Sequence, residues 1–401
     1  MILSTKTSTK FANTTKQTNL NNFIGEYKTV CKFFVDELWS LDKVPTLLPK
    51  DITSKANTWL SKRAIQCSAK QASGIVRGTK QKQKQRLYVY NKLLKDGCFR
   101  KAKKLKTFID KAQTSKPNLN SIKPELDSRF VKADLSNKTS FDGWIKLSSL
   151  GNKLNLAIPF KKTKHFNKLL NDGGQLRSGV RISNKSLTFM FDLPDAPLKT
   201  EGKTIGLDVG IKNVYTTSDC QVSQDDKHGW NLTKIQQRLT RRKKNSKGFE
   251  RAQAHRTNYI NHSVNQLNFS GVNHLKLERI KNLRRGRRSS RLLSHWTYAT
   301  LFDKLDRTCA RLGVQVSRVS PTYTSQRCSQ CGWVRKSNRK GRLFKCTSCG
   351  HTEDADLNAS RNIVLKLPAI GRKQRLQHKN RVGFYWNVVS QECIVSDAQK
   401  A

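Results

Sequence analysis

Two closely spaced cysteine pairs place the strongest constraint on how this chain folds. Cys328 and Cys331 form one C-x₂-C pair, Cys346 and Cys349 form the other, and residues 332–345 separate them. Two such pairs offer four thiolates, which complete the tetrahedral shell of one structural zinc ion. Glycine follows each pair directly, as a tight knuckle turn favours. We predict a zinc ribbon whose closed shell leaves no place for a catalytic water. The alternatives are chance and a redox dithiol, which would not need a second matching pair.

The net charge limits the partners that the chain can have. Lys and Arg total 78 against 28 Asp and Glu, a formal net charge of +50 over 401 residues. A chain with this charge repels itself unless a polyanion neutralises it, and nucleic acid is the natural partner. An anionic membrane is the alternative, but no apolar run approaches the ~20 residues that span a bilayer. No signal-peptide apolar region follows Met1 either. We therefore predict nucleic-acid partners and no membrane partner.

Helical periodicity dominates the first part of the chain. Apolar residues recur at helical spacing between Leu20 and Trp39, after a possible short strand at residues 1–5. Asp51 is the predicted N-cap of a second helix. The apolar residues of that second helix are Ile52, Ala56, Trp59, Leu60 and Ala64.

A strongly basic segment follows between Arg77 and Lys106, with Asp96 as its single acid. It is either a solvated helix face or a surface that contacts phosphates, and the net charge favours the second interpretation. The candidate contacts are Arg77, Lys80, Lys82, Lys84 and Arg86.

Between about residues 128 and 193 the period of the apolar pattern changes to two. Leu154, Leu156 and Ile158 alternate with polar residues, and a second alternating run occupies residues 187–193. This pattern predicts a small antiparallel barrel or sandwich. Pro194 and Pro197 then mark a linker.

Strand and helix patterns alternate in the second half. An apolar strand at residues 204–209 has a possible hairpin partner at 213–217, and a basic helical stretch at 232–267 is interrupted near Ser246. We also expect a helix that ends at Gly313, a glycine suited to a C-cap. Further predicted elements are strands at 272–277 and 314–319 and a helix at 356–367.

Three acids stand at the ends of these predicted elements. Asp208 lies at the end of the first apolar strand between two glycines, Glu278 ends the strand at 272–277, and Asp356 opens the last helix. Each acid also has an ordinary structural interpretation when it is taken singly. These are a turn residue for Asp208, a salt-bridge partner for Glu278 and a helix N-cap for Asp356. Together they are a candidate metal site beside these interpretations, because in-line cleavage of a phosphodiester can use two Mg²⁺ ions and hard cations require oxygen ligands.

The motifs around these acids resemble a known family. Residues 206–210 (GLDVG) resemble the first RuvC motif of the TnpB nucleases of insertion sequences and of the compact type V CRISPR effectors. Residues 275–283 (LKLERIKNL) resemble their second motif, and residues 355–363 (ADLNASRNI) their third. The cysteine pairs resemble their zinc ribbon. Ser360 stands where alanine is common, a change of one small residue for another.

The resemblance extends from about residue 203 to 367, and it implies roles for individual residues. Asp208, Glu278 and Asp356 fall on the catalytic acids of the family, with Cys328, Cys331, Cys346 and Cys349 as ligands of structural zinc. Residues 232–267 resemble the basic helical segment between the first two motifs. The candidate nucleic-acid contacts there are Arg238, Arg241, Arg242, Lys243 and Lys244.

The resemblance also implies a multidomain α+β fold. Its core would be an RNase H-like (RuvC) α/β nuclease domain with an inserted zinc ribbon, preceded by a helical recognition lobe and a β-barrel wedge domain. The expected boundaries are: 1–16, first part of the wedge; 17–125, recognition lobe; 126–200, wedge; 201–320, RuvC motifs one and two; 321–352, zinc ribbon; 353–368, third motif; 369–401, basic tail.

The implied function is RNA-guided cleavage of DNA, with two Mg²⁺ ions in the RuvC site, one structural Zn²⁺ and a guide RNA. The expected partners are the guide RNA and double- and single-stranded DNA, in a monomer or dimer that is cytoplasmic, nucleoid-associated and prokaryotic or phage-encoded. The alternatives are a guided repressor that binds DNA without cutting it, and a nucleic-acid-binding transposition accessory protein.

Overall fold

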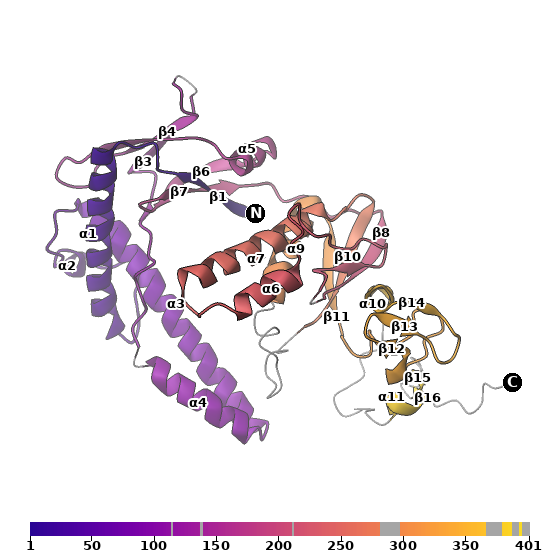
Figure 1. Ribbon diagram of the computed structural model, residues 1–401. Helices are drawn as coiled ribbons and strands as arrows, with labels where there is room; N and C mark the ends of the chain where they lie inside the picture. The colour runs from indigo at the N-terminus through magenta and orange to yellow at the C-terminus, as the bar shows by residue number, and fades with distance from the viewer. Residues whose placement is uncertain are drawn as a thin grey trace. The chain divides into compact units, whose positions relative to one another are not determined.

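The computed structural model describes residues 1–113, 115–136, 139–210, 212–280, 297–365, 379–386 and 393–394. The chain divides into two compact units, Met1–Pro194 and Asp195–Ala401. Figure 1 labels the elements of both units, and each unit is described by itself below.

Two long helices form the first half of the N-terminal unit. α1, Thr14–Trp39, and α3, Lys62–Lys95, pack side by side (Figure 1) and bury apolar faces against each other. Asn13 and Ser61 cap them, because each side chain accepts a hydrogen bond from the backbone amide three residues further on. The predicted helix between Leu20 and Trp39 is confirmed and begins six residues earlier, at Thr14.

The predicted helix start at Asp51 is wrong. α2, Lys50–Thr53, is a single turn that begins after Pro49, and the chain then leaves the helical conformation. Leu60 forms a β-bridge with Gly151, where an added Cβ would meet backbone atoms. Tertiary pairing with the sheet region therefore overrides the local helical spacing of the apolar residues.

The basic segment is helical, as predicted. α3 continues to Lys95, and α4, Phe99–Gln113, follows a turn at Gly97, whose φ is +65°. α4 packs back against α3.

Two antiparallel sheets complete the N-terminal unit, with α5, Lys164–Asn171, between two of their strands. The first sheet has the order β1-β7-β6-β2 and the second the order β3-β4-β5. The strands are β1 Ile2–Ser8, β2 Glu125–Leu126, β3 Val131–Asp134, β4 Gly143–Leu147, β5 Leu156–Phe160, β6 Gln175–Ile182 and β7 Ser186–Asp192.

Phenylalanine rings fill the space between the sheets. Phe160 of β5 lies 4.9 Å from Phe189 of β7 between ring centroids, and Phe166 of α5 lies 5.1 Å from Phe191. No ladder of hydrogen bonds joins the two sheets among the residues described. The predicted closed barrel is therefore corrected to the sandwich alternative, two sheets that pack through side chains.

The C-terminal unit is built on one mixed sheet of order β11-β10-β8-β9. β8, Lys203–Asp208, β10, Val272–Glu278, and β11, Gln315–Val319, are parallel, and β9, Thr216–Thr217, is antiparallel to β8. The apolar residues of β8 and β10 are buried, as expected for parallel strands with both faces covered. The predicted strands in this half are confirmed, although the hairpin partner is shorter than expected.

Four helices accompany this sheet: α6 Leu232–Thr240, α7 Lys247–Gln266, α9 Tyr298–Leu312 and α10 Ala355–Val364. The predicted interruption is confirmed, because Ser246 caps α7 through the amide of Phe249. Gly313 ends α9 in the left-handed conformation, with φ +65°, as predicted.

A small ribbon surrounds the cysteine pairs. Its strands are β12 Arg339–Lys340, β13 Leu343–Lys345 and β14 Thr352–Asp354, which form one antiparallel sheet.

The described part of the predicted basic tail packs on this ribbon. It consists of α11, Lys379–Val382, and the short strands β15, Tyr385–Trp386, and β16, Cys393–Ile394. Phe384 is fully buried, and the ring of Tyr385 lies 4.8 Å from that of Trp333. The rest of the tail lies outside the described residues.

Within the described residues, every helix is too short or too polar to cross a membrane.

Candidate functional site

Two of the predicted acids end neighbouring parallel strands. β8 and β10 pair in a register that sets Leu207 beside Leu277, so Asp208 and Glu278, one residue further along, leave the same edge of the sheet together. Carboxyl ends of adjacent parallel strands are where α/β sheets form their sites. Both side chains are half-buried.

The third acid reaches this edge on α10, which packs against β8, β9 and β10. Asp354, not Asp356, is the N-cap of α10, because its Oδ1 accepts hydrogen bonds from the amides of Asp356 and Leu357 at 2.9 and 3.3 Å. Lys276 of β10 donates from Nζ to the carbonyl of Val364 at 2.6 Å, which fixes the other end of α10. The Asp356 carboxylate is therefore not used for capping.

Gly206 allows α10 to approach β8 closely. A Cβ atom built on Gly206 would lie 2.1 Å from the carbonyl oxygen of Ser360 and 3.0 Å from the backbone nitrogen of Val364. These are backbone atoms that cannot rotate away, so any larger residue would displace α10 and with it Asp356.

We expect Gly206→Ala to destabilise the C-terminal unit by roughly 2–4 kcal/mol, in the range of overpacking against fixed atoms. The matched control is Gly25→Ala on α1, where nothing lies within 4 Å of the added Cβ. This control should gain about 0.5–1 kcal/mol from the better helix propensity of alanine. Denaturant unfolding of both variants measures the difference, and equal stability would contradict the close approach.

The electrostatics of the three acids indicate a buried site in which three carboxylates face one nearby cation, Arg339. Burial raises the pKa of Asp208 to about 7, and the carboxylates of Glu278 and Asp356 act in the same direction, against Arg339. Burial also raises the pKa of Glu278, while a hydrogen bond from Thr324 and the charge of Arg339 oppose the rise. A bound cation would relieve this repulsion.

Two further residues contact the acids, and sequence reasoning missed both. Arg339 of β12 forms an ion pair with Asp356, with 2.8 Å between Nη2 and Oδ1. The hydroxyl of Thr324 donates to Oε1 of Glu278. Both residues lie in segments that carry the family resemblance, but spacing alone links neither of them to a carboxylate.

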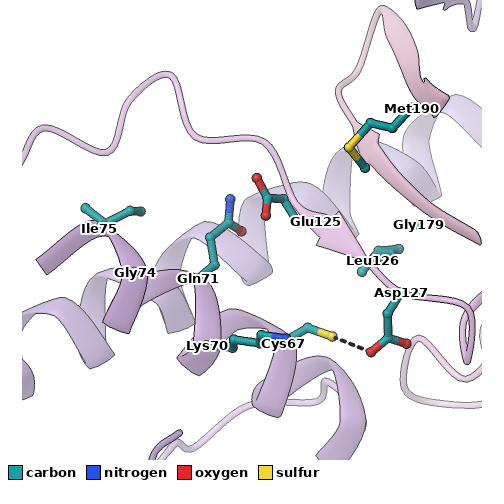
Figure 2. Close-up of a pocket in the computed structure, with 10 residues that line it drawn as sticks. All are labelled: Cys67, Lys70, Gln71, Gly74, Ile75, Glu125, Leu126, Asp127, Gly179 and Met190. Carbon is teal, nitrogen blue, oxygen red and sulfur yellow. Dashed lines mark hydrogen bonds between the residues drawn. The ribbon is translucent and has the colours of Figure 1, made fainter. Parts of the chain in front are cut away.

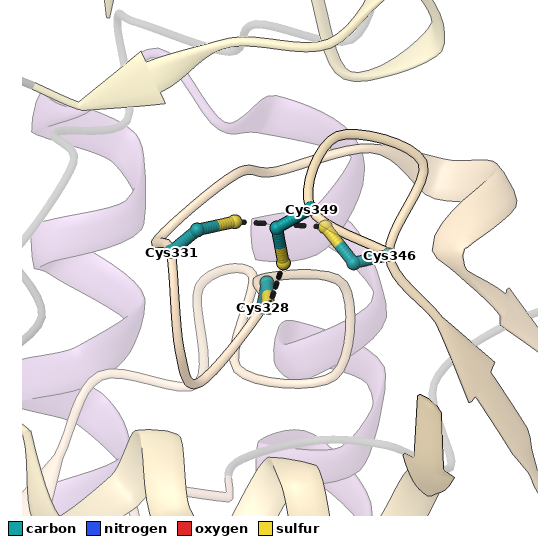
Figure 3. A group of neighbouring side chains, drawn as sticks. All are labelled: Cys328, Cys331, Cys346 and Cys349. Carbon is teal, nitrogen blue, oxygen red and sulfur yellow. Dashed lines mark hydrogen bonds between the residues drawn. The ribbon is translucent and has the colours of Figure 1, made fainter. Parts of the chain in front are cut away.

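The four cysteines meet as predicted, as Figure 3 shows. Sγ of Cys328 lies 3.7 Å from that of Cys349, and Sγ of Cys331 lies 3.6 Å from that of Cys346. Zn–S bonds of about 2.3 Å in a tetrahedron place the sulfurs about 3.8 Å apart. The sulfurs thus have the spacing of a zinc shell.

Among the residues described, these cysteines are the one group of metal-ligating side chains whose ligand atoms all lie within 4.8 Å of one another. The three acids are more widely spread. Two of them have separate partners, because Asp356 pairs with Arg339 and Glu278 accepts from Thr324.

The basic residues predicted on α3 remain at the surface, and three of them have partners within the protein. Arg77 donates to Oγ1 of Thr46 at 3.0 Å. Nζ of Lys80 lies 5.9 Å from the ring centroid of Trp39, and the guanidinium of Arg86 lies 4.8 Å from that of Phe108. Lys82 and Lys84 are exposed.

The basic residues predicted around α6 are all exposed. Arg238, Arg241 and Arg242 line a concavity of about 500 Å³ beside Trp230. The guanidinium of Arg238 lies 5.5 Å from the ring centroid of Trp230. No ion pair involves these three arginines within the described part of the chain.

A second concavity, of about 450 Å³, lies in the N-terminal unit between α3 and the strands β2, β6 and β7 (Figure 2). Lys70 faces it together with Glu125 and Asp127, and Cys67 donates from Sγ to Oδ2 of Asp127 at 3.7 Å. Its mixed charge does not indicate an anion site.

Comparison with known proteins shows what class of protein this chain resembles. Residues 298–363 match the family described as Cas12f1-like, TNB domain. The fold resembles that of the mini-RNA-guided endonuclease CRISPR-Cas_phi3, with a TM-score of 0.54 and 10% sequence identity over 92% of this chain and 93% of that one. The fold is thus a multidomain α+β fold similar to that of this endonuclease.

Particular relatives confirm the resemblance to TnpB proteins and compact type V effectors. The chain is 38% identical over 108 residues to the CRISPR-associated endodeoxyribonuclease Cas12f1 of Sulfoacidibacillus thermotolerans, which is 27% of this chain and 25% of that protein. It is 31% identical over 90 residues to a TnpB-like protein of Aquifex aeolicus, which is 20% of this chain and 29% of that protein. The alignments thus span between a quarter and a third of these relatives.

Proposed function

We propose that this protein is an RNA-guided DNA endonuclease that cuts with a RuvC-type site. The observation that carries the proposal is the convergence of Asp208, Glu278 and Asp356 on one edge of a mixed sheet. They converge in a chain with a net charge of +50 that carries a Cas12f1-like TNB domain. The relatives named as endodeoxyribonucleases support the same reaction class.

The residues present fit divalent cations at this edge. Three carboxylates supply the oxygen ligands that Mg²⁺ prefers, and burial first, then the charges of Glu278 and Asp356, raise the pKa of Asp208, which a bound cation would lower again. When bound there, two Mg²⁺ ions would supply an activated water and stabilise the leaving oxygen. Asp208, Glu278 and Asp356 would hold them, and Arg339, beside Asp356, would move to pair with substrate phosphate.

Zinc would have a different task. Cys328, Cys331, Cys346 and Cys349 fill a tetrahedral shell completely, so the ion would stabilise the ribbon and take no part in the reaction.

The basic surfaces would bind the nucleic acids. A chain this basic gains affinity for nucleic acid by neutralising phosphates, but this affinity does not depend on sequence. A guide RNA would supply the sequence specificity through base pairing. The exposed residues Arg238, Arg241, Arg242, Lys243 and Lys244 near α6, and Lys82 and Lys84 on α3, would contact phosphates. The domain boundaries expected from the sequence are part of this proposal.

The first experiment is to purify the protein from cells that carry its native flanking DNA and to sequence the RNA that accompanies it. We expect one abundant RNA from beside the gene, which then directs Mg²⁺-dependent cutting of DNA that matches its end. Binding of matched DNA without cutting would favour the guided repressor. Heterogeneous RNA, or none, would remove the guide and favour a transposition accessory protein.

The pKa of Asp208 predicts a pH dependence of stability in the metal-free protein. Its folded pKa of about 7 lies above its ordinary value of 3.8, so the folded state binds more protons than the unfolded state between these values. Stability should therefore fall as pH rises through this window, by at most about 1.4 kcal/mol per pH unit.

Thermal unfolding between pH 5 and 8, compared with Asp208→Asn, isolates this contribution, since the amide cannot titrate. Added Mg²⁺ should reduce the pH dependence of the melting temperature in the parent, because the cation takes the place of the proton on Asp208. Parallel pH profiles of the two proteins would show that Asp208 is ionised throughout.

A further inference from the structure

Both ends of the carboxylate cluster are contacted by residues from the cysteine ribbon and its approach. Arg339, between the two cysteine pairs, binds Asp356. Thr324, four residues before Cys328, donates its hydroxyl to Oε1 of Glu278 and is 3% exposed. Oε1 is thereby oriented by the protein, while Oε2 has no hydrogen bond from a described residue.

Two buried asparagines hold the segment from Thr324 to Ser329 in place. Asn362 donates from Nδ2 to the carbonyls of Thr324 at 3.0 Å and Arg327 at 2.7 Å. Asn358 donates from Nδ2 to the same carbonyl of Arg327 at 2.8 Å and accepts from the amide of Ser329 at 3.0 Å. Both asparagines are 0% exposed. We call Asn358 and Asn362 the asparagine clasp.

The asparagine clasp joins three parts of the site. Its two residues are four apart on α10, so they lie on one face of the helix that also carries Asp356. The segment they hold runs from Thr324 into the first cysteine pair, and Ser329 lies inside that pair. Nδ2 of each buried amide donates to a carbonyl of this segment, so the segment and α10 must be in place together, although Oδ1 of Asn362 has no hydrogen-bond partner among the described residues.

We propose that Thr324 is a positioning residue for Glu278, and that the asparagine clasp makes its position depend on the folded cysteine ribbon. The proposal rests on the proposed function, in which Glu278 holds a divalent cation. A glutamate at a strand end has several rotamers, and fixing one of them costs entropy that a hydrogen bond offsets. A partner that orients a ligand in this way typically changes metal affinity or activity 10- to 100-fold.

Binding of Mn²⁺ to the full-length, RNA-free protein, measured by calorimetry, tests the role of Thr324. Thr324→Val keeps the shape of the side chain and removes the hydroxyl, whereas Thr324→Ser keeps the hydroxyl. We expect Val to weaken Mn²⁺ binding about 10- to 100-fold, and Ser to remain within about threefold of the parent. The zinc content and melting temperature of both variants show whether the ribbon is still folded.

The outcomes separate this proposal from the proposed function. If Thr324→Val binds Mn²⁺ as tightly as the parent, the positioning role is wrong and the nuclease site stands. If the parent shows no Mn²⁺ binding that Asp208→Ala removes, the carboxylate site itself is wrong, and both proposals fail. If Thr324→Val loses zinc, a comparison at equal zinc occupancy with Thr324→Ser decides, because serine restores the hydroxyl alone.

The dependence on the ribbon is tested by combining Thr324→Val with Cys346→Ser. If the ribbon acts on Glu278 through Thr324, the two substitutions share one effect, and the double variant should bind Mn²⁺ about as weakly as the weaker single variant. Independent effects would instead multiply. Multiplied losses would overturn the coupling.

Discussion

Asp208→Ala should lower guided DNA cleavage by at least about 10³-fold, because a metal ligand in a phosphodiesterase site contributes several kcal/mol to the transition state. Asp208 ends β8 beside Glu278 and is the acid whose pKa is raised to about 7. RNA binding should be unchanged, since the substitution makes a basic chain slightly more positive. Single-turnover cleavage and an RNA-binding titration measure the two effects.

Asp303→Ala is the matched control for this experiment. Asp303 lies on α9 of the same unit, and its side chain is 58% exposed in an ion pair with Arg307 four residues on. Exposed pairs of this type contribute at most about 0.5 kcal/mol, so cleavage should be unaffected. If Asp208→Ala still cuts DNA while the control behaves like the parent, the three acids are not the catalytic site.

Cys346→Ser should remove the ribbon zinc and unfold the ribbon. Zinc binding in small ribbon-like domains corresponds to about 10–16 kcal/mol of folding free energy, and loss of one thiolate opens a shell in which Sγ of Cys346 lies 3.6 Å from that of Cys331. Cleavage should fall as well, because Thr324 and Arg339 contact the acids from this region. Zinc content measured by elemental analysis should drop from about one ion per chain to near zero.

Cys220→Ser is the control for cysteine loss. Cys220 is an exposed free cysteine of the same unit, outside the four-cysteine group. Its replacement should change neither zinc content nor cleavage. Full zinc content in Cys346→Ser would show that zinc binding does not require the thiolate of Cys346.

Most of the secondary structure followed from local patterns. The interruption at Ser246 and the helix end at Gly313 depend on capping chemistry that one or two residues carry, so the sequence predicts them well. The second N-terminal helix was predicted wrongly because Leu60 pairs with Gly151, ninety residues away, and a local pattern contains no such partner. The closed barrel was wrong for a related reason, since alternation fixes which face of a strand is buried and not which strands pair.

The candidate site also contains some residues that local patterns predict and others that they do not. The cysteines are predictable because two short spacings suffice for a tetrahedron, and their sulfurs have that geometry. The three acids could be selected by their places at the ends of strands and a helix, but each has an ordinary structural interpretation when taken singly, and the family resemblance was needed to assign them as catalytic acids. Arg339 and Thr324 were missed because their contacts depend on how the ribbon folds back on α10.

The late arrival of α10 has a consequence for the cell that makes this protein. Asp208 and Glu278 leave the ribosome well before Asp356, which lies about 150 residues after Asp208 along the chain. At roughly 5–20 residues per second, this corresponds to about 7–30 s of synthesis. During that time β8 has no α10 to pack against Gly206, and the carboxylate cluster is incomplete. A nascent or prematurely terminated chain is therefore expected to bind nucleic acid through its basic helices without being able to cut it.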